Sequence, residues 1–371
     1  MPSRPVPALP GVTQEVITGP VTVALGSDLP KSYASAFGTL LNQTPTVATM
    51  NGAQVLSVVA EGESAGAQIE LSPLPAPGVP LAERFFAVVM PFATVQDDIS
   101  LSEVQGRWQG VDPNRLFATD DAAAMLPVIL GTLNAKVVTE DELLAALEAE
   151  PDAIGLISFD HLDPRYKVLT VDGVNVLSNR LQPATYPLAV ALTVEGKGSS
   201  VLAPLLQPLT KPYTNRAPNE LTTLIMTGVT AMARGTAAAM EQRGVLFPAL
   251  IISDTLAAAD ITHVSNEIPF LEGCVVNNTV NNLTLCSHTS YWATLEAIGT
   301  DVVGLSGNHV NDFGRDGARE SLTFYQDNEI PIYGSGFTIE EACAPLMWEH
   351  NGNTFAFIAA LAFDPPGAWV T

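Results

Sequence analysis

Short apolar runs alternate with helical stretches along most of the chain. The β-branched run Val21–Leu25 leads through a polar turn into a helical pattern over Lys31–Leu41. Arg84–Met90 is a bounded apolar run of the kind that forms a buried strand. Helices are predicted over Leu101–Trp108, after an N-cap serine, and over Thr139–Glu150, which opens like a capping box. This alternation is typical of an α/β fold.

The alternation of apolar runs and helical stretches continues to the end of the chain, and a Gly- and Pro-rich stretch divides it into two parts. A length of 371 residues also favours two domains. Residues 1–20 form a Pro-rich leader that we expect to be disordered, 21–195 a first α/β domain, 196–219 a Gly- and Pro-rich linker, and 220–371 a second α/β domain. Further helices are predicted over Asp120–Leu133, Ala231–Gln242, Leu250–Ala258, Ser290–Ile298 and Arg315–Asn328.

The amino-acid composition argues against some classes of binding partner. The chain has 39 Asp and Glu against 16 Lys and Arg, a formal net charge of −23, and 47% apolar residues. Nucleic acid is excluded as a partner because phosphate binding needs clustered cations, and docking on anionic lipid is disfavoured for the same reason. No apolar run reaches about 18 residues, so no segment is predicted to span a membrane. The acidic balance fits a secreted or surface protein.

Three cysteines leave two interpretations open. Cys274 and Cys286 lie twelve residues apart and flank an Asn-rich loop, whereas Cys343 stands alone. In an oxidising compartment the first two can form a disulfide across the loop, and in a reducing one all three remain thiols. The chain has no Cys-x-x-Cys pair, which argues against a metal site made of cysteines alone.

Polar loops follow three predicted strands of the second domain. They are the stretches at 227–230, 265–267 and 307–312, and the last carries Asn308, His309 and Asp312 after the apolar run Val302–Leu305. Because the carboxyl ends of parallel strands meet at one edge of a sheet, we expect the three loops to converge. A carboxylate, an amide oxygen and an imidazole at such an edge are suitable donors for a divalent metal.

Each of these residues also has a structural interpretation. Glu267 is unpaired in an apolar stretch, so it needs a metal, a proton-transfer role or a salt bridge, for which Arg234 and Arg315 are available. His309 can be a histidine satisfied within the fold. The Asn-His-x-x-Asp pattern in a strand-end loop favours a functional role for it.

Motifs in the second domain resemble those of a known family. They are Gly228-Val229-Thr230-Ala231-Met232-Ala233-Arg234, Ser265-Asn266-Glu267-Ile268-Pro269, Gly307-Asn308-His309-Val310-Asn311-Asp312-Phe313-Gly314, Gly334-Ser335-Gly336 and Glu341-Ala342-Cys343-Ala344-Pro345. In this order they resemble the bacterial capsule-synthesis family CapA, the poly-γ-glutamate synthesis proteins with a calcineurin-like metallophosphoesterase fold.

The resemblance assigns roles to individual positions. It implies that Glu267 and Asn308 are metal ligands, that His309 acts as an acid or an oxyanion donor, and that Asp312 orients His309. The family's first-motif Asp aligns with Val229, which cannot bind metal. Thr230 then offers a hydroxyl in its place, and Arg234 is the motif's arginine. The later His motifs of the family would lie beyond Thr371, so we expect the C-terminal metallophosphoesterase-like domain to be incomplete.

The first domain resembles a second group of proteins. The stretches Phe85–Phe92, Asp98–Leu101, Trp108–Gly110, Ala153–Ile157 and Tyr186–Leu188 are similar to the type 2 periplasmic-binding-protein fold of phosphate-type importers. Such domains hold anions on helix N-termini and hydroxyls. The resemblance implies a donor at Ser27, for which capping of the following helix is the alternative.

Three functional hypotheses follow. The first is a cell-envelope enzyme of the CapA type that hydrolyses or transfers a group of an anionic polymer such as poly-γ-glutamate, assisted by a divalent metal. The second is a non-catalytic envelope module, which Val229 favours. The third is an oxyanion or solute receptor that acts through the first domain. All three imply an extracellular or cell-surface location, with the signal or lipid anchor outside this sequence.

Overall fold

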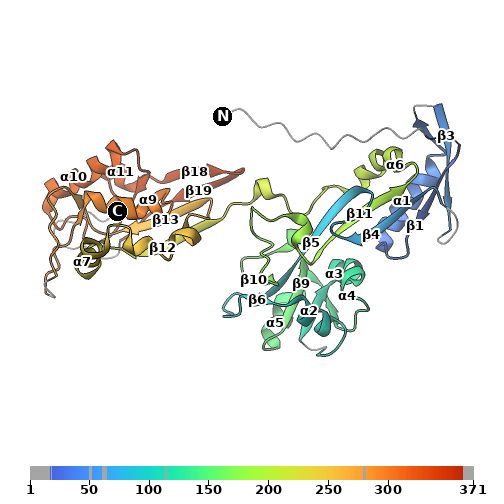
Figure 1. Ribbon diagram of the computed structural model, residues 1–371, viewed down its shortest axis with the longest axis horizontal. Helices are drawn as coiled ribbons and strands as arrows, with labels where there is room; N and C mark the ends of the chain where they lie inside the picture. Colours follow the sequence, from blue (N-terminus) through green and yellow to red (C-terminus); the bar gives the residue numbers. More distant parts are fainter. Residues whose placement is uncertain are drawn as a thin grey trace. The chain divides into compact units, whose positions relative to one another are not determined.

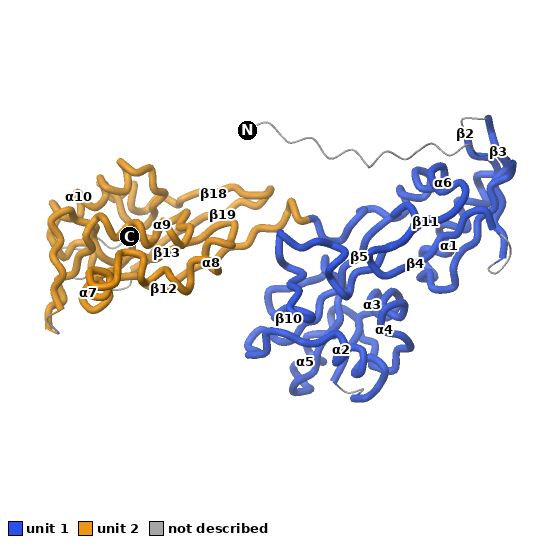
Figure 2. Tube along the Cα trace, in the orientation of Figure 1, with its two compact units in different colours: residues 1–217 blue, residues 218–371 orange. Residues whose placement is uncertain are grey.

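The computed structural model divides the chain into two compact units. Unit 1 comprises residues 1–217 and unit 2 residues 218–371 (Figure 2). The structure describes residues 17, 19–49, 52–60, 65–112, 115–278 and 281–361. The leader predicted over 1–20 therefore lies almost wholly outside the described residues. Among those that are described, no helix combines the length and the apolar character needed to cross a membrane.

Unit 1 is built on one long sheet in two lobes. Its path runs β2-β3-β1-β4-β11-β5-β9-β7-β8, with β10 paired to β5 and β6. The strands are β1 Val21–Leu25, β2 Thr46–Thr49, β3 Gly52–Val59, β4 Ala67–Pro73, β5 Val79–Pro91, β6 Asp98–Ile99, β7 Leu116–Thr119, β8 Lys136–Val138, β9 Ile154–Ser158, β10 Tyr166–Val171 and β11 Ala189–Gly196.

Strand β5 connects the two lobes of unit 1. Its first half pairs with β11, and its second half pairs with β9 and β10. The residues from Phe85 to Val89 are at most 1% exposed, which accounts for the unbroken apolar run there, since a strand buried on both faces does not alternate. Figure 1 shows α1 and α6 with one lobe and α2 to α5 with the other.

The helices of unit 1 agree in part with the pattern. They are α1 Lys31–Gln43, α2 Leu101–Trp108, α3 Asp120–Met125, α4 Pro127–Leu130, α5 Glu140–Ala149 and α6 Ser199–Leu206, with short 3₁₀ segments η1 Phe159–His161, η2 Pro183–Thr185 and η3 Gln207–Thr210. Ser100 caps α2, and a capping box formed by Thr139 and Glu142 opens α5, as predicted. The single helix predicted over Asp120–Leu133 is wrong, because Pro127 has no N–H to continue α3 and instead begins α4.

The segment predicted as a linker, 196–219, is largely part of unit 1. It contains α6 and η3, and Leu202 and Leu206 are fully buried. The side chain of Asn215 bonds the main chain of Phe85 at 2.8 and 3.0 Å. The Pro and Gly residues of this stretch favour a loop in the local sequence, and the short apolar helix α6 was therefore not predicted. The chain passes into unit 2 at 217–218.

Arg216 fastens the end of this segment to the sheet. It is 2% exposed, and its guanidinium donates to the carbonyls of Val176, at 2.6 Å, and Ser178. The same group lies 5.8 Å from the ring centroid of Phe85. Burial lowers the pKa of Arg216, but these carbonyl and aromatic partners match a charged guanidinium.

Unit 2 has a four-stranded parallel sheet at its centre. The order is β12-β13-β16-β17, formed by β12 Leu224–Thr230, β13 Ile261–Asn266, β16 Val302–Gly304 and β17 Ile332–Tyr333. Two small pairs accompany it: β14 Phe270–Leu271 with β15 Ser287–His288, and the hairpin of β18 Leu346–His350 with β19 Asn353–Phe357. Gly228, expected in the polar loop at 227–230, lies inside β12, where the register with β13 shifts between Met226 and Val229.

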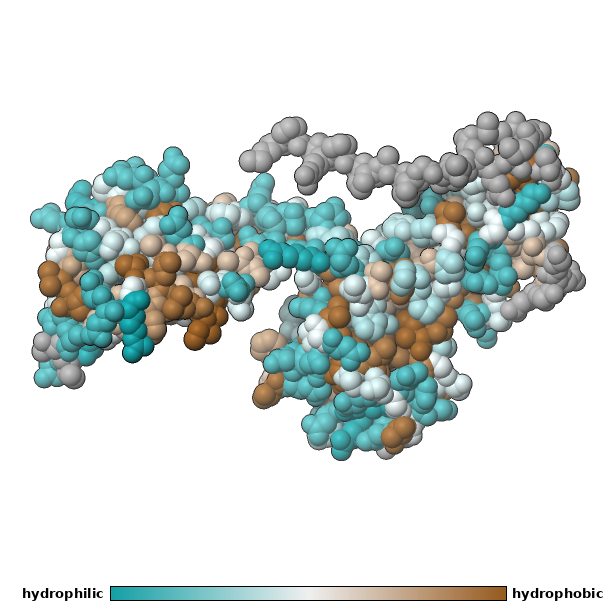
Figure 3. All heavy atoms as spheres, viewed as in Figure 1, coloured by the Kyte–Doolittle hydropathy of each residue, from teal (hydrophilic) through white to brown (hydrophobic). Residues whose placement is uncertain are grey.

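Helices of unit 2 surround this sheet (Figure 1). They are α7 Arg234–Arg243, α8 Ser253–Leu256, α9 Trp292–Ala297, α10 Gly314–Asp327 and α11 Ile339–Cys343, with η4 Pro218–Glu220, η5 Phe247–Ala249 and η6 Thr289–Tyr291. The helix predicted over Leu250–Ala258 is wrong except for the single turn α8. Leu250 and Ile251 are 68% and 93% exposed, so no core holds a longer helix here. Figure 3 shows apolar residues on the surface of this unit.

One face of the unit 2 sheet carries a buried histidine. His263 on β13 is 3% exposed, its Nε2 lies 2.9 Å from the hydroxyl of Tyr333, and its ring stacks on Phe357. Its Nδ1 has no hydrogen-bond partner among the described residues. Burial lowers the pKa of His263 below its ordinary value of 6.5, because the charged ring is poorly solvated.

Replacing Arg216 tests its role as a fastening of unit 1. We expect Arg216→Ala to lower the free energy of unfolding by about 2 to 4 kcal/mol, since it leaves the carbonyl of buried Val176 without its donor and removes one of the two donors to the carbonyl of Ser178. Urea denaturation followed by circular dichroism measures the loss. Arg180→Ala, at an exposed arginine of the same unit, is the control, and equal small effects of both changes would contradict the assignment.

The buried His263 makes unit 2 sensitive to acid. Between pH 6.5 and the lower pKa of the folded state, the unfolded chain binds more protons, so stability falls as pH falls through this window. We expect His263→Gln to remove that part of the pH dependence, whereas His288→Gln leaves it in place. The difference between the urea midpoints at pH 7.5 and 5.5 measures this pH dependence. An unchanged difference in His263→Gln would show that another group is responsible.

Candidate functional site

The three polar loops predicted from the sequence lie at one edge of the unit 2 sheet. In the parallel registers Thr230 pairs with Asn266, and Ser265 pairs with Gly304. The residues that follow these positions therefore leave the sheet side by side. This brings Glu267 and the loop that begins at Leu305 to a common edge, the place where α/β sheets bind ligands.

A glycine allows two of these loops to touch. A Cβ added at Gly307 would lie 2.2 Å from Cβ and 2.4 Å from Cα of Glu267. No real side chain tolerates such distances, so only glycine permits the loop that carries Asn308 and His309 to lie against Glu267. Gly307 therefore lies against Glu267 and directly precedes Asn308, the two residues predicted as metal ligands.

Asn266, the residue before Glu267, is anchored at the end of β13. Asn266 is fully buried, and its amide donates to the carbonyl of Ile268 and the hydroxyl of Tyr325, both at 2.8 Å. Glu267 follows Asn266 directly after the end of β13. Its backbone N–H donates to the carbonyl of Thr230 at 3.4 Å.

The carboxylate of Glu267 is half-buried and has no hydrogen bond or ion pair with any described residue. The salt bridge considered for it, with Arg234 or Arg315, is therefore not formed. Arg234 begins α7 and lines a cavity of ≈ 370 Å³ together with both cysteines and Phe313, so the structure places it with the loop that follows β14.

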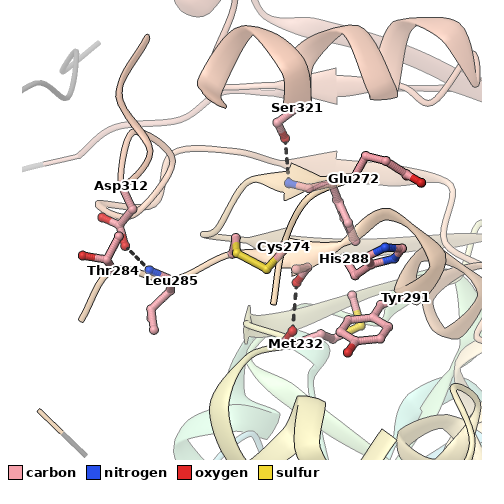
Figure 4. Close-up of a disulfide and its surroundings, with 12 residues drawn as sticks. Met232, Glu272, Cys274, Thr284, Leu285, His288, Tyr291, Asp312 and Ser321 are labelled. Atoms are coloured by element: carbon pink, nitrogen blue, oxygen red, sulfur yellow. Dashed lines mark hydrogen bonds between the residues drawn. A yellow bond between two sulfur atoms is a disulfide. The ribbon is translucent and has the colours of Figure 1, made fainter. Parts of the chain in front are cut away.

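His309 and Asp312 form a hydrogen-bonded pair. Nδ1 of His309 lies 2.7 Å from Oδ2 of Asp312, and the two side chains are 19% and 16% exposed. When the carboxylate is ionised, Nδ1 carries the shared proton, which leaves Nε2 to meet a ligand. The same Oδ2 accepts a hydrogen bond from the Leu285 N–H at 2.7 Å, a contact visible in Figure 4.

A disulfide holds the segment that supplies this N–H. Cys274 and Cys286 are joined across the loop between β14 and β15, and Leu285 is the residue before the second cysteine (Figure 4). Ser287, directly after it, pairs with Phe270 and donates its hydroxyl to the Met232 carbonyl at 3.1 Å. Disulfide, loop, Asp312 and His309 thus form one connected chain of contacts. Cys343 is free and exposed.

A cavity of ≈ 350 Å³ adjoins the His309 loop. Its polar lining includes Ser306, Gly307 and Asn311 from this loop, Arg315 and Arg319 from α10, and Gly334, Ser335, Gly336 and Thr338 after β17. Arg319 forms no ion pair with any described residue. Arg319 was not among the residues predicted from the sequence, although its spacing of four from Arg315 places both on one face of a helix.

The metal predicted at this edge lacks a full set of strong ligands. Val229 stands 65% exposed at the end of β12 and has no donor atom. In the described part of the chain, the one group of three His, Cys, Asp or Glu whose ligand atoms all lie within 4.8 Å of one another is in unit 1 and consists of Asp121, Glu140 and His161. The ligand roles of Glu267 and Asn308 remain predictions.

Ser27, the donor predicted in unit 1, is exposed in the turn between β1 and α1. The alternative that it caps the helix is wrong, because the N-cap of α1 is Pro30. A role for Ser27 in binding stays a prediction.

Comparison with known families finds a match over unit 2. Residues 223–368 match the family model described as bacterial capsule synthesis protein PGA_cap. Unit 2 matches the capsule-synthesis family. The match begins at β12 and includes every residue of the edge described above, from Val229 to Asp312. No curated protein matches the chain.

Solved structures similar to this chain include phosphate-binding proteins. A phosphate transport receptor from Vibrio cholerae is 12% identical, with 51% of this chain and 94% of that chain covered and a TM-score of 0.35. A possible phosphate binding protein from Planctomyces limnophilus DSM 3776 is 13% identical, with coverages of 53% and 89% and a TM-score of 0.34. PstS from Borrelia burgdorferi is 10% identical, with 53% of this chain and 94% of that chain covered and a TM-score of 0.33. Scores below 0.5 assign no ligand to this chain.

The close approach at Gly307 predicts a specific sensitivity. Gly307→Ala forces its methyl group into Glu267, and we expect it to destabilise unit 2 by about 1 to 3 kcal/mol and to displace the His309 loop. Gly228→Ala is the matched control, since its added Cβ would meet nothing within 4 Å. Thermal unfolding and the NMR signal of His309 report both effects, and a Gly307 variant that behaves like the control would refute the contact.

Proposed function

We propose that this chain serves capsule synthesis at the bacterial cell envelope and that unit 2 binds an anionic capsule polymer of the poly-γ-glutamate kind. The family match supports the capsule connection. The observation that carries the polymer assignment is the cavity beside the His309 loop, which offers Arg315 and Arg319 in a chain with a net charge of −23.

The lining of this cavity suits a chain of carboxylates. Guanidinium groups bind carboxylates in a forked geometry, and two of them on one helix face can engage successive acidic side groups. The hydroxyls of Ser335 and Thr338 and the glycines beside them add hydrogen-bonding capacity. The apolar part of the lining, Leu305, Leu322 and Ile339, suits the methylene groups between the carboxylates.

The acidic surface elsewhere makes this local pair selective. Charges separated by more than a Debye length of about 8 Å are largely screened at physiological salt. A polyanion is therefore not held by the molecule as a whole, and its attachment depends on arginines close at hand. We infer a single preferred attachment point on unit 2 for this reason.

A binding role fits the edge better than metal-assisted hydrolysis. Val229 removes one donor of the family motif, and the described residues do not complete a set around Glu267. The His309–Asp312 pair lies in the loop beside the cavity and is not among the residues that line it. The hydrolase or transferase hypothesis is the second candidate, and the Asn308-His309 sequence is what favours it.

Removal of Arg319 tests the proposal. We expect Arg319→Ala to weaken binding of fluorescently labelled poly-γ-glutamate about tenfold, measured by anisotropy at 150 mM salt, because one charge-assisted contact is lost. Arg243→Ala, an exposed arginine on α7 of the same unit, is the matched control and leaves the affinity unchanged.

Two outcomes would overturn the proposal. Equal affinities of the wild type and Arg319→Ala would exclude the cavity as the attachment point. Shortening of the polymer during incubation, lost in His309→Ala, would replace the binding role with the hydrolase.

A further inference from the structure

The second lobe of unit 1 gathers three metal-ligating side chains at one sheet edge. Strands β9, β7 and β8 are adjacent and parallel. Asp121 follows β7 in the first turn of α3, Glu140 follows β8 at the start of α5, and His161 follows β9 at the end of η1. Each residue therefore comes directly after the carboxyl end of its own strand, which is where an α/β sheet presents a site.

The side chains converge as well as the strand ends. One ligand atom from each lies within 4.8 Å of the other two, and Nδ1 of His161 is 2.7 Å from Oε1 of Glu140. The side chains of His161 and Glu140 are 42% and 41% exposed. The group is thus open to solvent and accessible to an ion.

Two ordinary explanations account for only part of this arrangement. Acidic residues are favourable in the first turn of a helix, which explains why Asp121 and Glu140 occur where they do. A hydrogen bond between His161 and Glu140 explains that pair. Neither explains why a second carboxylate from another helix approaches the same imidazole, because two like charges so close together repel each other.

We propose that Asp121, Glu140 and His161 form a binding site for a divalent transition-metal ion. An ion between the two carboxylates would remove their repulsion. One nitrogen and two oxygens from three separate elements suit Zn²⁺ or a neighbouring metal better than Ca²⁺ or Mg²⁺, which prefer oxygen ligands alone. Three protein ligands leave the fourth tetrahedral position to water or to an anionic group.

The site changes the expectation for this lobe. The sequence resemblance implied a domain that holds anions directly on helix N-termini and hydroxyls. Here the starts of α3 and α5 carry carboxylates, including Asp120 and Asp141 beside the two ligands. A bare anion is repelled by this edge, and an anion would bind there only through the metal.

Isothermal titration of the full chain with Zn²⁺ tests the proposal. The protein carries Cys343→Ser, so that the one free cysteine does not compete. We expect one ion per chain with micromolar affinity. His161→Ala, Glu140→Gln and Asp121→Asn each weaken binding at least tenfold.

Matched controls separate a built site from general acidity. Asp120→Asn and Asp141→Asn remove the neighbouring charges and should change the affinity less than threefold. His309→Ala should retain the ion, which distinguishes this site from the edge of unit 2. Equal losses in the Asp120 and Asp121 variants, or binding unaffected by His161→Ala, would overturn the proposal.

Discussion

Parallel strand pairing is the constraint on which both candidate sites depend. A parallel pair leaves its carboxyl ends on the same side, so side chains far apart in sequence meet without any further device. In unit 2 this applies to β12, β13 and β16 and brings Glu267 beside the His309 loop. In unit 1 it applies to β9, β7 and β8 and brings Asp121, Glu140 and His161 together. The polar residues of the unit 1 edge are exposed, whereas those of the unit 2 edge are half-buried.

Packing below each edge determines how firmly these residues are held. At the edge of unit 2, Gly307 lies against Glu267, and a buried Asn266 fixes the strand end. Asp312 ties the His309 ring to the loop closed by the disulfide. At the edge of unit 1, the ligands lie in the first turns of helices or at the end of a single 3₁₀ turn, and their side chains are exposed. The first edge is therefore preorganised, and the second can adjust to an ion that it binds.

The sequence predicted many of the strands and most helices because their apolar periods are local. Val21–Leu25 and Leu101–Trp108 have the predicted bounds. It failed at 196–219, where tertiary burial of Leu202, Leu206 and Arg216 outweighs the local Pro and Gly signal. It failed again at Leu250–Ala258, where a helical period has no core to pack against.

The candidate site residues were predicted where they are close in sequence and missed where only the fold brings them together. The loop with His309 and Asp312 was identified because its residues are adjacent in sequence. Asp121, Glu140 and His161 were not identified, because forty residues separate the first from the last and only the sheet order brings them together. Arg319 lies between these cases, since its helical spacing from Arg315 is local but the cavity that it lines is not.

The cavity of unit 2 and the edge of unit 1 differ in the sign of charge that they present, and this constrains how the protein handles anions. In the proposed function, the guanidinium groups that line the cavity of unit 2 bind a carboxylate chain directly. The edge of unit 1 contributes carboxylates and excludes such a chain unless a metal intervenes. Polymer binding to unit 2 then needs no added ion, whereas any anion bound by unit 1 needs one. Dependence on a chelator therefore separates the activities of the two units within a single intact chain.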